Sequence, residues 1–141
     1  MLSFTSSLRP DTEGFAIFVN EKYEYKHNLI SNGTVDKINS FLKVLKKNKI
    51  NKELNSFNIS EDKTCFIIKV KNKYETYWPQ EIGGNFFSYI KNINHLNKID
   101  IFVDSLHFNN EQLVSFFSKF IFGFILKSYT FNKYKTLNKE K

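Results

Sequence analysis

Side chains capable of metal or nucleophilic chemistry are few in this sequence and lie far apart. His27, His95 and His107 are scattered, and none pairs with another at the spacing of a zinc-binding helix motif. Cys65 has no second cysteine to form an internal disulfide with. It alternates with apolar residues on a predicted strand, which indicates a small buried side chain. These residues therefore predict no metal site and no activated nucleophile.

The carboxylates and glycines offer two weak candidates for ligand binding. Asp104 follows a predicted strand at the sheet edge where α/β proteins collect ligands, although a turn or helix-capping role also fits it. Gly83 and Gly84 could cradle a phosphate, but two adjacent glycines are more typical here of a loose helix start. Hydrolysis by two metals needs several carboxylates around ions ~3.5–4 Å apart, and no segment supplies them.

The elements that would position these residues alternate between strands and helices. Thr34 is the predicted N-cap of the first helix, whose apolar residues recur at helical spacing. Such alternation predicts an α/β fold: a mixed, largely parallel sheet flanked by helices. We expect the strands at residues 14–19, 54–59, 64–70 and 98–103, with a hairpin between the middle two, and the helices at 35–47, 80–91 and 111–128.

Composition gives a basic chain without a clear nucleic-acid signature. The 141 residues carry a formal charge of +7 from 21 Lys+Arg against 14 Asp+Glu, yet Arg9 is the one arginine. Bidentate recognition of phosphate and guanine favours arginine, so we expect no nucleic-acid partner. No signal peptide is evident, and the apolar run at 120–126 is far shorter than a ~18-residue membrane span. We therefore expect a cytoplasmic protein with no membrane partner.

The last predicted helix is apolar around nearly its whole circumference between Leu113 and Leu126. In a domain this small the sheet can cover one face of such a helix, so a second face implies a partner surface. The alternative is a phenylalanine-rich composition that overfills a core helix. The interface candidates are Phe117, Phe120, Phe124, Tyr129, Phe131, Tyr134 and Lys135.

The end of this helix resembles the end of the N-terminal domain of the leucyl (cytosol) aminopeptidase family. That family closes a long helix with a pattern like Gly-x-x-Leu-x-x-Tyr-x-Phe-x-x-Tyr-Lys. The residues in register with it are Gly123, Leu126, Tyr129, Phe131, Tyr134 and Lys135. The order of strands and helices also agrees, whereas Lys71–Tyr74 stand where the family often has a glycine-rich turn, and Tyr77–Pro79 suggest a divergent branch.

The resemblance implies a non-catalytic α/β domain over residues 1–131, similar to the macro domain, and a charged tail or linker over 132–141. In that family a larger C-terminal domain removes N-terminal amino acids from peptides, using two divalent metals, zinc or manganese, and the enzyme assembles as a hexamer. Its Asn-Thr-Asp-Ala-Glu-Gly-Arg motif is not in these residues, so no catalytic or metal residue is transferred. The expected partners are its own catalytic domain and further copies of the chain.

Two other classes of function remain open at this point. A free-standing macro-like module would bind a small ligand such as ADP-ribose, which calorimetry would detect. A basic nucleic-acid binder would show an affinity that falls steeply with salt.

Overall fold

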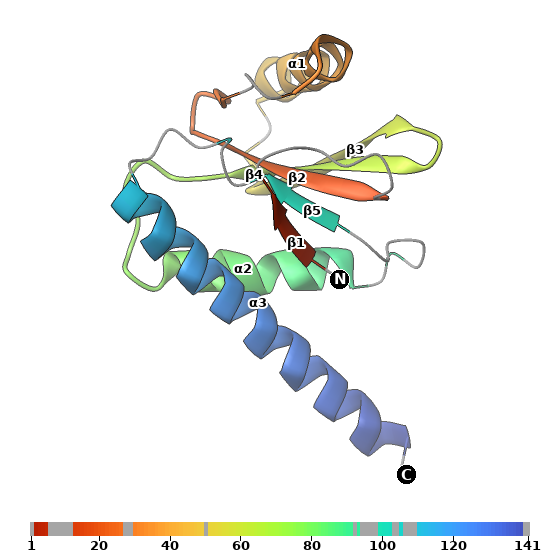
Figure 1. The fold of residues 1–141 in the computed structure, drawn as a ribbon, viewed down its shortest axis with the longest axis vertical. Coiled ribbons are helices and arrows are strands. Elements are labelled where there is room, and N and C mark those ends of the chain that lie inside the picture. The colour runs from red at the N-terminus through yellow and green to blue at the C-terminus, as the bar shows by residue number, and fades with distance from the viewer. Residues whose placement is uncertain are drawn as a thin grey trace. The chain divides into compact units, whose positions relative to one another are not determined.

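A computed structural model describes residues 2–5, 13–26, 30–49, 51–91, 93, 99–102, 105 and 110–139, with backbone alone for 2–5, 110 and 132–139. Backbone contacts divide the chain into two compact units. One unit comprises Met1–Asn72 and His95–His107, and the other comprises Lys73–Asn94 and Phe108–Lys141. The sheet and the first helix belong to the first unit, and two further helices form the second (Figure 1).

The first unit is built on a five-stranded sheet in the order β1-β5-β2-β4-β3. Strands β1, β5, β2 and β4 pair in parallel, and β3 pairs antiparallel with β4 in a hairpin. The predicted α/β fold with a mixed, largely parallel sheet is therefore confirmed, and so is the hairpin. The strand bounds are β1 (Leu2–Thr5), β2 (Gly14–Val19), β3 (Leu54–Ser60), β4 (Lys63–Lys69) and β5 (Ile99–Phe102).

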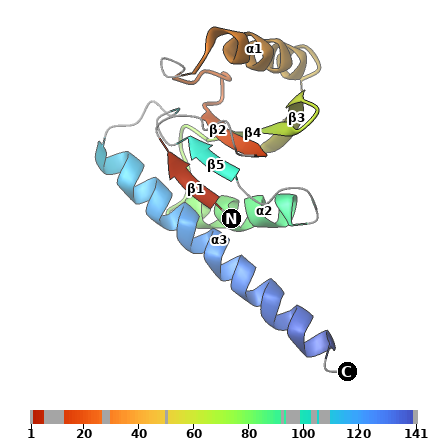
Figure 2. The same ribbon diagram turned by 45° about the vertical axis from the view of Figure 1, so that its right-hand side comes forward.

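Helix α1 (Asn32–Lys47) lies over one face of this sheet (Figures 1 and 2). Its buried stripe of Val35, Ile38, Leu42 and Leu45 packs into the same cluster as the side chains of β2 and β4 that point to that face. The apolar side chains that point to the other face of the sheet, such as Phe18 on β2, are buried as well. Central parallel strands buried on both faces need continuous apolar sequence, which is why β2 has no polar alternation.

Helix α1 starts earlier than Thr34 predicted, because Ser31 occupies the N-cap position. Ser31 has an extended backbone, with φ −62° and ψ 148°, and its backbone carbonyl accepts from the N–H of Val35 at 3.0 Å. The Ser31 hydroxyl donates to the Thr34 hydroxyl oxygen at 2.9 Å, so Thr34 lies in the first turn. The predicted cap is thus wrong by one turn; both residue types favour this role, and sequence spacing did not separate them.

A buried serine ties the end of β5 to β2 within the first unit. The Ser105 side chain is fully buried; its Oγ accepts from the backbone N–H of Phe18 at 2.9 Å and donates to the carbonyl of Phe102 at 2.7 Å. The backbone carbonyl of Ser105 also accepts from the N–H of Lys26 at 2.8 Å. One residue therefore satisfies donors and acceptors where the strands end.

The second unit is a pair of helices, α2 (Trp78–Ile90) and α3 (Asn110–Lys139). Helix α2 starts before residue 80, because Pro79 at its first turn suits a helix start. Helix α3 continues past the predicted end at Ser128 as far as Lys139. Residues 132–139, expected to be a charged tail or linker, are therefore the last turns of this helix.

Candidate functional site

Helices α2 and α3 touch backbone to backbone at two glycines. A Cβ on Gly83 would collide with the carbonyl group of Phe120, with the carbonyl carbon 2.9 Å away. A Cβ on Gly123 would collide with the carbonyl group of Gln80, with its carbon 2.7 Å away. Each helix thus offers one glycine to a carbonyl of the other, and no larger residue fits at either position.

Aromatic rings extend this contact along the packed side of α3. Phe86 lies 6.0 Å from Phe120 and 6.2 Å from Phe124 between ring centroids, in tilted geometry. Phe87 meets the rings of Phe124 at 5.3 Å and Phe131 at 5.7 Å edge to face. Edge-to-face pairs at these separations each contribute about 0.5–1.5 kcal/mol beyond the area they bury. The ring contacts of these α3 residues therefore lie within the helix pair.

Phe117 also belongs to this packed side. Its side chain is buried, and its ring lies 5.2 Å from Phe116 and 6.4 Å from Phe120. Four of the predicted interface residues, Phe117, Phe120, Phe124 and Phe131, thus contribute to the α2–α3 pair or its aromatic cluster. Tyr134 and Lys135 lie within the bounds of α3, and their side chains are outside the described part of the chain.

The opposite side of α3 carries a row of solvent-exposed apolar side chains, which we call the α3 apolar face. Successive residues of an α-helix are turned by about 100°, and by that rule the row lies across the helix from Phe120 and Phe124. Tyr129 is the predicted interface residue that lies on it. The α3 apolar face comprises Val114 (68% exposed), Phe122 (56%), Ile125 (59%), Leu126 (47%) and Tyr129 (65%).

The sequence prediction missed the other members of this face because it treated the helix as apolar all round. The distinguishing signal was Gly123, which marks the side of α3 that approaches another backbone. Phe120 and Phe124 lie within about 100° of Gly123 around the helix, and both contact α2. Ile125 lies farther round, and it is exposed.

A groove of about 500 Å³ runs beside the glycine contact, within the second unit. Gly84 and Gly123 line it, together with polar side chains of both helices. Gly84 lies inside α2, as does Gly83, so the expected loose helix start is wrong and the strand-to-helix turn of a phosphate cradle is not found here. The groove's longer side chains are Tyr77, Glu81, Asn85, Leu126, Lys127 and Thr130.

The remaining candidates divide between buried and undescribed positions. Asp104, His27, His95 and His107 lie outside the described residues. Cys65 is fully buried, as expected, and burial raises the pKa of its thiol well above the ordinary value. Among the described residues no group of three or more His, Cys, Asp or Glu side chains is placed to hold a metal ion.

The stretch Glu111–Phe131 of α3 is also long and apolar enough to cross a membrane, judged by length and composition. Within its apolar part, 22% is buried. The expectation of no such helix was wrong, because it counted only the unbroken apolar run at 120–126. Neutral residues such as Ser115 and Ser118 interrupt the apolar run without adding charge, and the helix continues through them. The core helix of a soluble protein can meet the same criterion, so the finding does not place the protein in a membrane.

Comparison of the chain with protein-family models and with curated proteins found no match. The resemblance to leucyl aminopeptidases therefore depends on residues 123–135 and on the order of strands and helices.

Proposed function

We propose that this chain is the non-catalytic N-terminal domain of a cytosolic leucyl-type metallo-aminopeptidase, whose C-terminal domain removes N-terminal amino acids from peptides with two zinc or manganese ions. The α3 apolar face is the observation that carries the proposal. In this role the face packs against the catalytic domain, and the domain supports assembly of the oligomer, a hexamer in that family.

The geometry of α3 supports this role because the motif residues divide between its two sides. Gly123 and Phe131 hold α3 against α2, whereas Leu126 and Tyr129 project from the α3 apolar face. A helix end that is fixed on one side and apolar on the other is suited to joining two domains.

The size of the α3 apolar face fits an interdomain contact. Fully burying a large apolar side chain contributes about 1.5–3 kcal/mol, and these residues are roughly half to two-thirds exposed. Covering all of them would therefore supply roughly 5 kcal/mol before the costs of association. Contacts between domains of one chain avoid most of those costs, because the linker already holds the partners together.

The packing of α3 also favours a soluble domain over a membrane anchor. Its aromatic contacts with Phe86 and Phe87 of α2 occupy one side along several turns. If α3 crossed a membrane by itself, Phe86 and Phe87 would lose these contacts. Our proposal accordingly includes a cytoplasmic location and neither a membrane nor a nucleic-acid partner.

The first test is enzymatic. The purified chain with added zinc or manganese should not hydrolyse a leucyl amide, and the gene should continue past residue 141 into a domain with an Asn-Thr-Asp-Ala-Glu-Gly-Arg-like motif. Robust hydrolysis by this chain, or a reading frame without that domain, would refute the proposal.

The second test changes the α3 apolar face in the full-length protein. Ile125→Lys places a charge at the expected interface and should destabilise the assembled enzyme, measured by its thermal midpoint and by size-exclusion chromatography. Val44→Lys is the matched control, because Val44 is an apolar helix residue with similar exposure, 50%, on α1. Equal effects of the two substitutions would show that the α3 apolar face is not the interface.

A further inference from the structure

The first unit has an open hollow of about 600 Å³ on its surface, at the carboxyl ends of the parallel strands β2 and β4. The turn after β2, the end of β4 and the end of α1 form its walls. This edge of an α/β sheet is where ligands bind in such folds, because the strand ends and following loops converge there. We call it the lysine cavity; its charged and amide side chains are Lys22, Lys46, Lys49, Lys69, Glu21 and Asn51.

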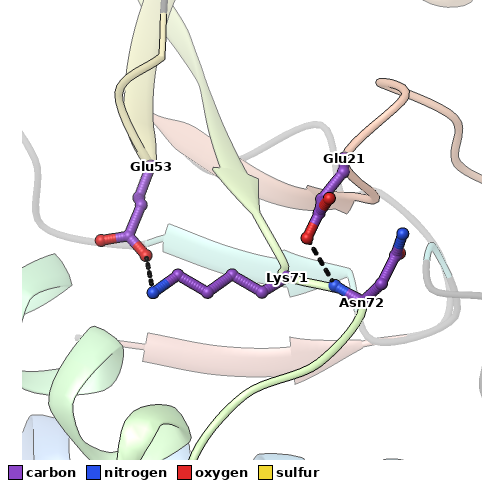
Figure 3. A network of polar contacts seen from close by, with 4 residues as sticks. All are labelled: Glu21, Glu53, Lys71 and Asn72. Carbon is purple, nitrogen blue, oxygen red and sulfur yellow. Dashed lines mark hydrogen bonds and ion pairs between the residues drawn. The ribbon is translucent and has the colours of Figure 1, made fainter.

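Positive charge dominates the lysine cavity. Its one carboxylate, Glu21, accepts a hydrogen bond from the backbone N–H of Asn72 at 2.9 Å (Figure 3). The adjacent Lys71 forms its ion pair with Glu53, at 3.9 Å, so Glu53 is also engaged (Figure 3). Within the described part of the chain, no carboxylate lies within ion-pair distance of the lysines that line the cavity.

Two residues with left-handed backbone lie in the walls of the same cavity. Tyr23 has φ 63° and Lys49 has φ 52°, and among the described residues they are the non-glycine residues with positive φ. Both line the lysine cavity. Tyr23 adopts this conformation in the turn after β2, whereas Lys49 follows the C-cap Asn48 of α1, where a left-handed residue commonly ends a helix.

The strained turn is held in place by its own hydrogen bonds. The Asn20 side-chain oxygen accepts from the N–H groups of Lys22 and Glu24 at 2.9 Å each, and the Asn20 carbonyl accepts from the N–H of Tyr23 at 2.9 Å. The Lys69 ammonium lies 4.6 Å from the centre of the Tyr23 ring and 3.4 Å from its hydroxyl. The walls are therefore organised before any ligand arrives, which lowers the cost of binding.

We propose that the lysine cavity binds a small oligophosphate such as tripolyphosphate. Lysine ammonium groups are compact charges without the planar fork of arginine, so such a site recognises the amount of negative charge more than its shape. Tyr23 is 9% exposed and its ring packs beneath Lys69, so it offers no surface on which a base could stack. Phosphate charge, and not a nucleobase, is therefore what this cavity is built to recognise.

The four lysines favour ligands that carry several negative charges. The carbonyl end of a helix carries a partial negative charge that disfavours anions, and α1 ends beside Lys46 and Lys49. That field opposes every anion in proportion to its charge, so the lysines must offset it. A single phosphate reaches few ammonium groups, whereas several linked phosphates contact several at once. Tripolyphosphate should consequently bind more tightly than inorganic phosphate.

Calorimetry at fixed ionic strength tests the proposal with tripolyphosphate and inorganic phosphate as probes. Lys46→Gln should weaken tripolyphosphate binding about fivefold, the effect of removing one charge at contact distance in a solvated site. Lys47→Gln is the control, because Lys47 follows on the same helix and does not line the cavity. Equal losses in both variants would show diffuse attraction to a basic chain and overturn the proposal, as would the lack of saturable binding.

Lys49→Gly separates ligand binding from folding. Glycine adopts φ 52° without strain, so this variant should melt about 3 °C higher while its tripolyphosphate affinity falls. A purely structural role for Lys49 predicts unchanged affinity, and that result would contradict its place in the site. Binding to tripolyphosphate does not involve the α3 apolar face, so the outcome is independent of the aminopeptidase proposal.

Discussion

The substitution Gly123→Ala tests how tightly α2 and α3 approach one another. The added Cβ would stand 2.7 Å from the Gln80 carbonyl carbon and closer still to its oxygen. The Cβ is fixed directly to the α3 backbone and the carbonyl belongs to the α2 backbone, so no side-chain rotation can relieve the contact. The helices must separate, and the ring contacts of Phe86 with Phe120 and Phe124 must then lengthen.

The size of the effect follows from two opposing terms. Overpacking of a rigid contact costs about 1–3 kcal/mol, and we expect the upper part of that range because backbone meets backbone. Replacing glycine by alanine inside a helix returns about 1 kcal/mol. The free energy of unfolding should therefore fall by about 2 kcal/mol, which lowers the melting temperature by about 6 °C in a chain of this size.

Two other glycines serve as controls in the same urea and thermal unfolding experiments. A Cβ on Gly84 would have its nearest neighbour at 3.5 Å, an ordinary contact, and a Cβ on Gly33 would meet nothing within 4 Å. Both alanine variants should keep or raise the free energy of unfolding, by up to about 1 kcal/mol. If Gly123→Ala is as stable as Gly84→Ala, the inferred close approach of the helices is incorrect.

Ser105→Ala should lower the free energy of unfolding by about 1–3 kcal/mol in urea titrations, because the buried N–H of Phe18 loses its acceptor. Burial, with a smaller contribution from Cys65, raises the pKa of Tyr25 to about 12. The neutral phenol is therefore favoured in the folded state, so alkaline unfolding should set in between the ordinary Tyr pKa and about pH 12, and Tyr25→Phe should weaken that pH dependence. The Cys65 thiol should resist a thiol reagent in the native protein and react after unfolding; rapid native reaction would contradict its burial.

Local pattern predicted the elements whose sequences are long or strongly periodic. The apolar run of β2, the β3–β4 hairpin and the buried stripe of α1 all lie where sequence placed them. Strand β1 was missed because four residues, Leu2–Thr5, carry too short a pattern to distinguish from a loop. The extension of α3 was missed because its last turns are rich in lysine and asparagine, which read as a solvated tail.

The candidate surfaces depended on contacts between segments distant in sequence. Sequence showed that α3 carries more apolar surface than a single neighbour needs, but it did not divide that surface between a packed and an exposed side. The lysine cavity was not predicted, since Lys22, Lys46 and Lys69 belong to separate elements with no common motif. Their convergence follows from the parallel pairing of β2 with β4 and from the end point of α1.

The sequence by itself determined the fold class, the buried faces of β2 and α1, and the excess of apolar residues on the last helix, because hydrophobic periodicity is a property of neighbouring residues. Tertiary structure alone decided which glycines must be glycine, which side of α3 remains exposed and which lysines share a cavity. Those features depend on distances between segments far apart in the chain, and no local pattern encodes such distances.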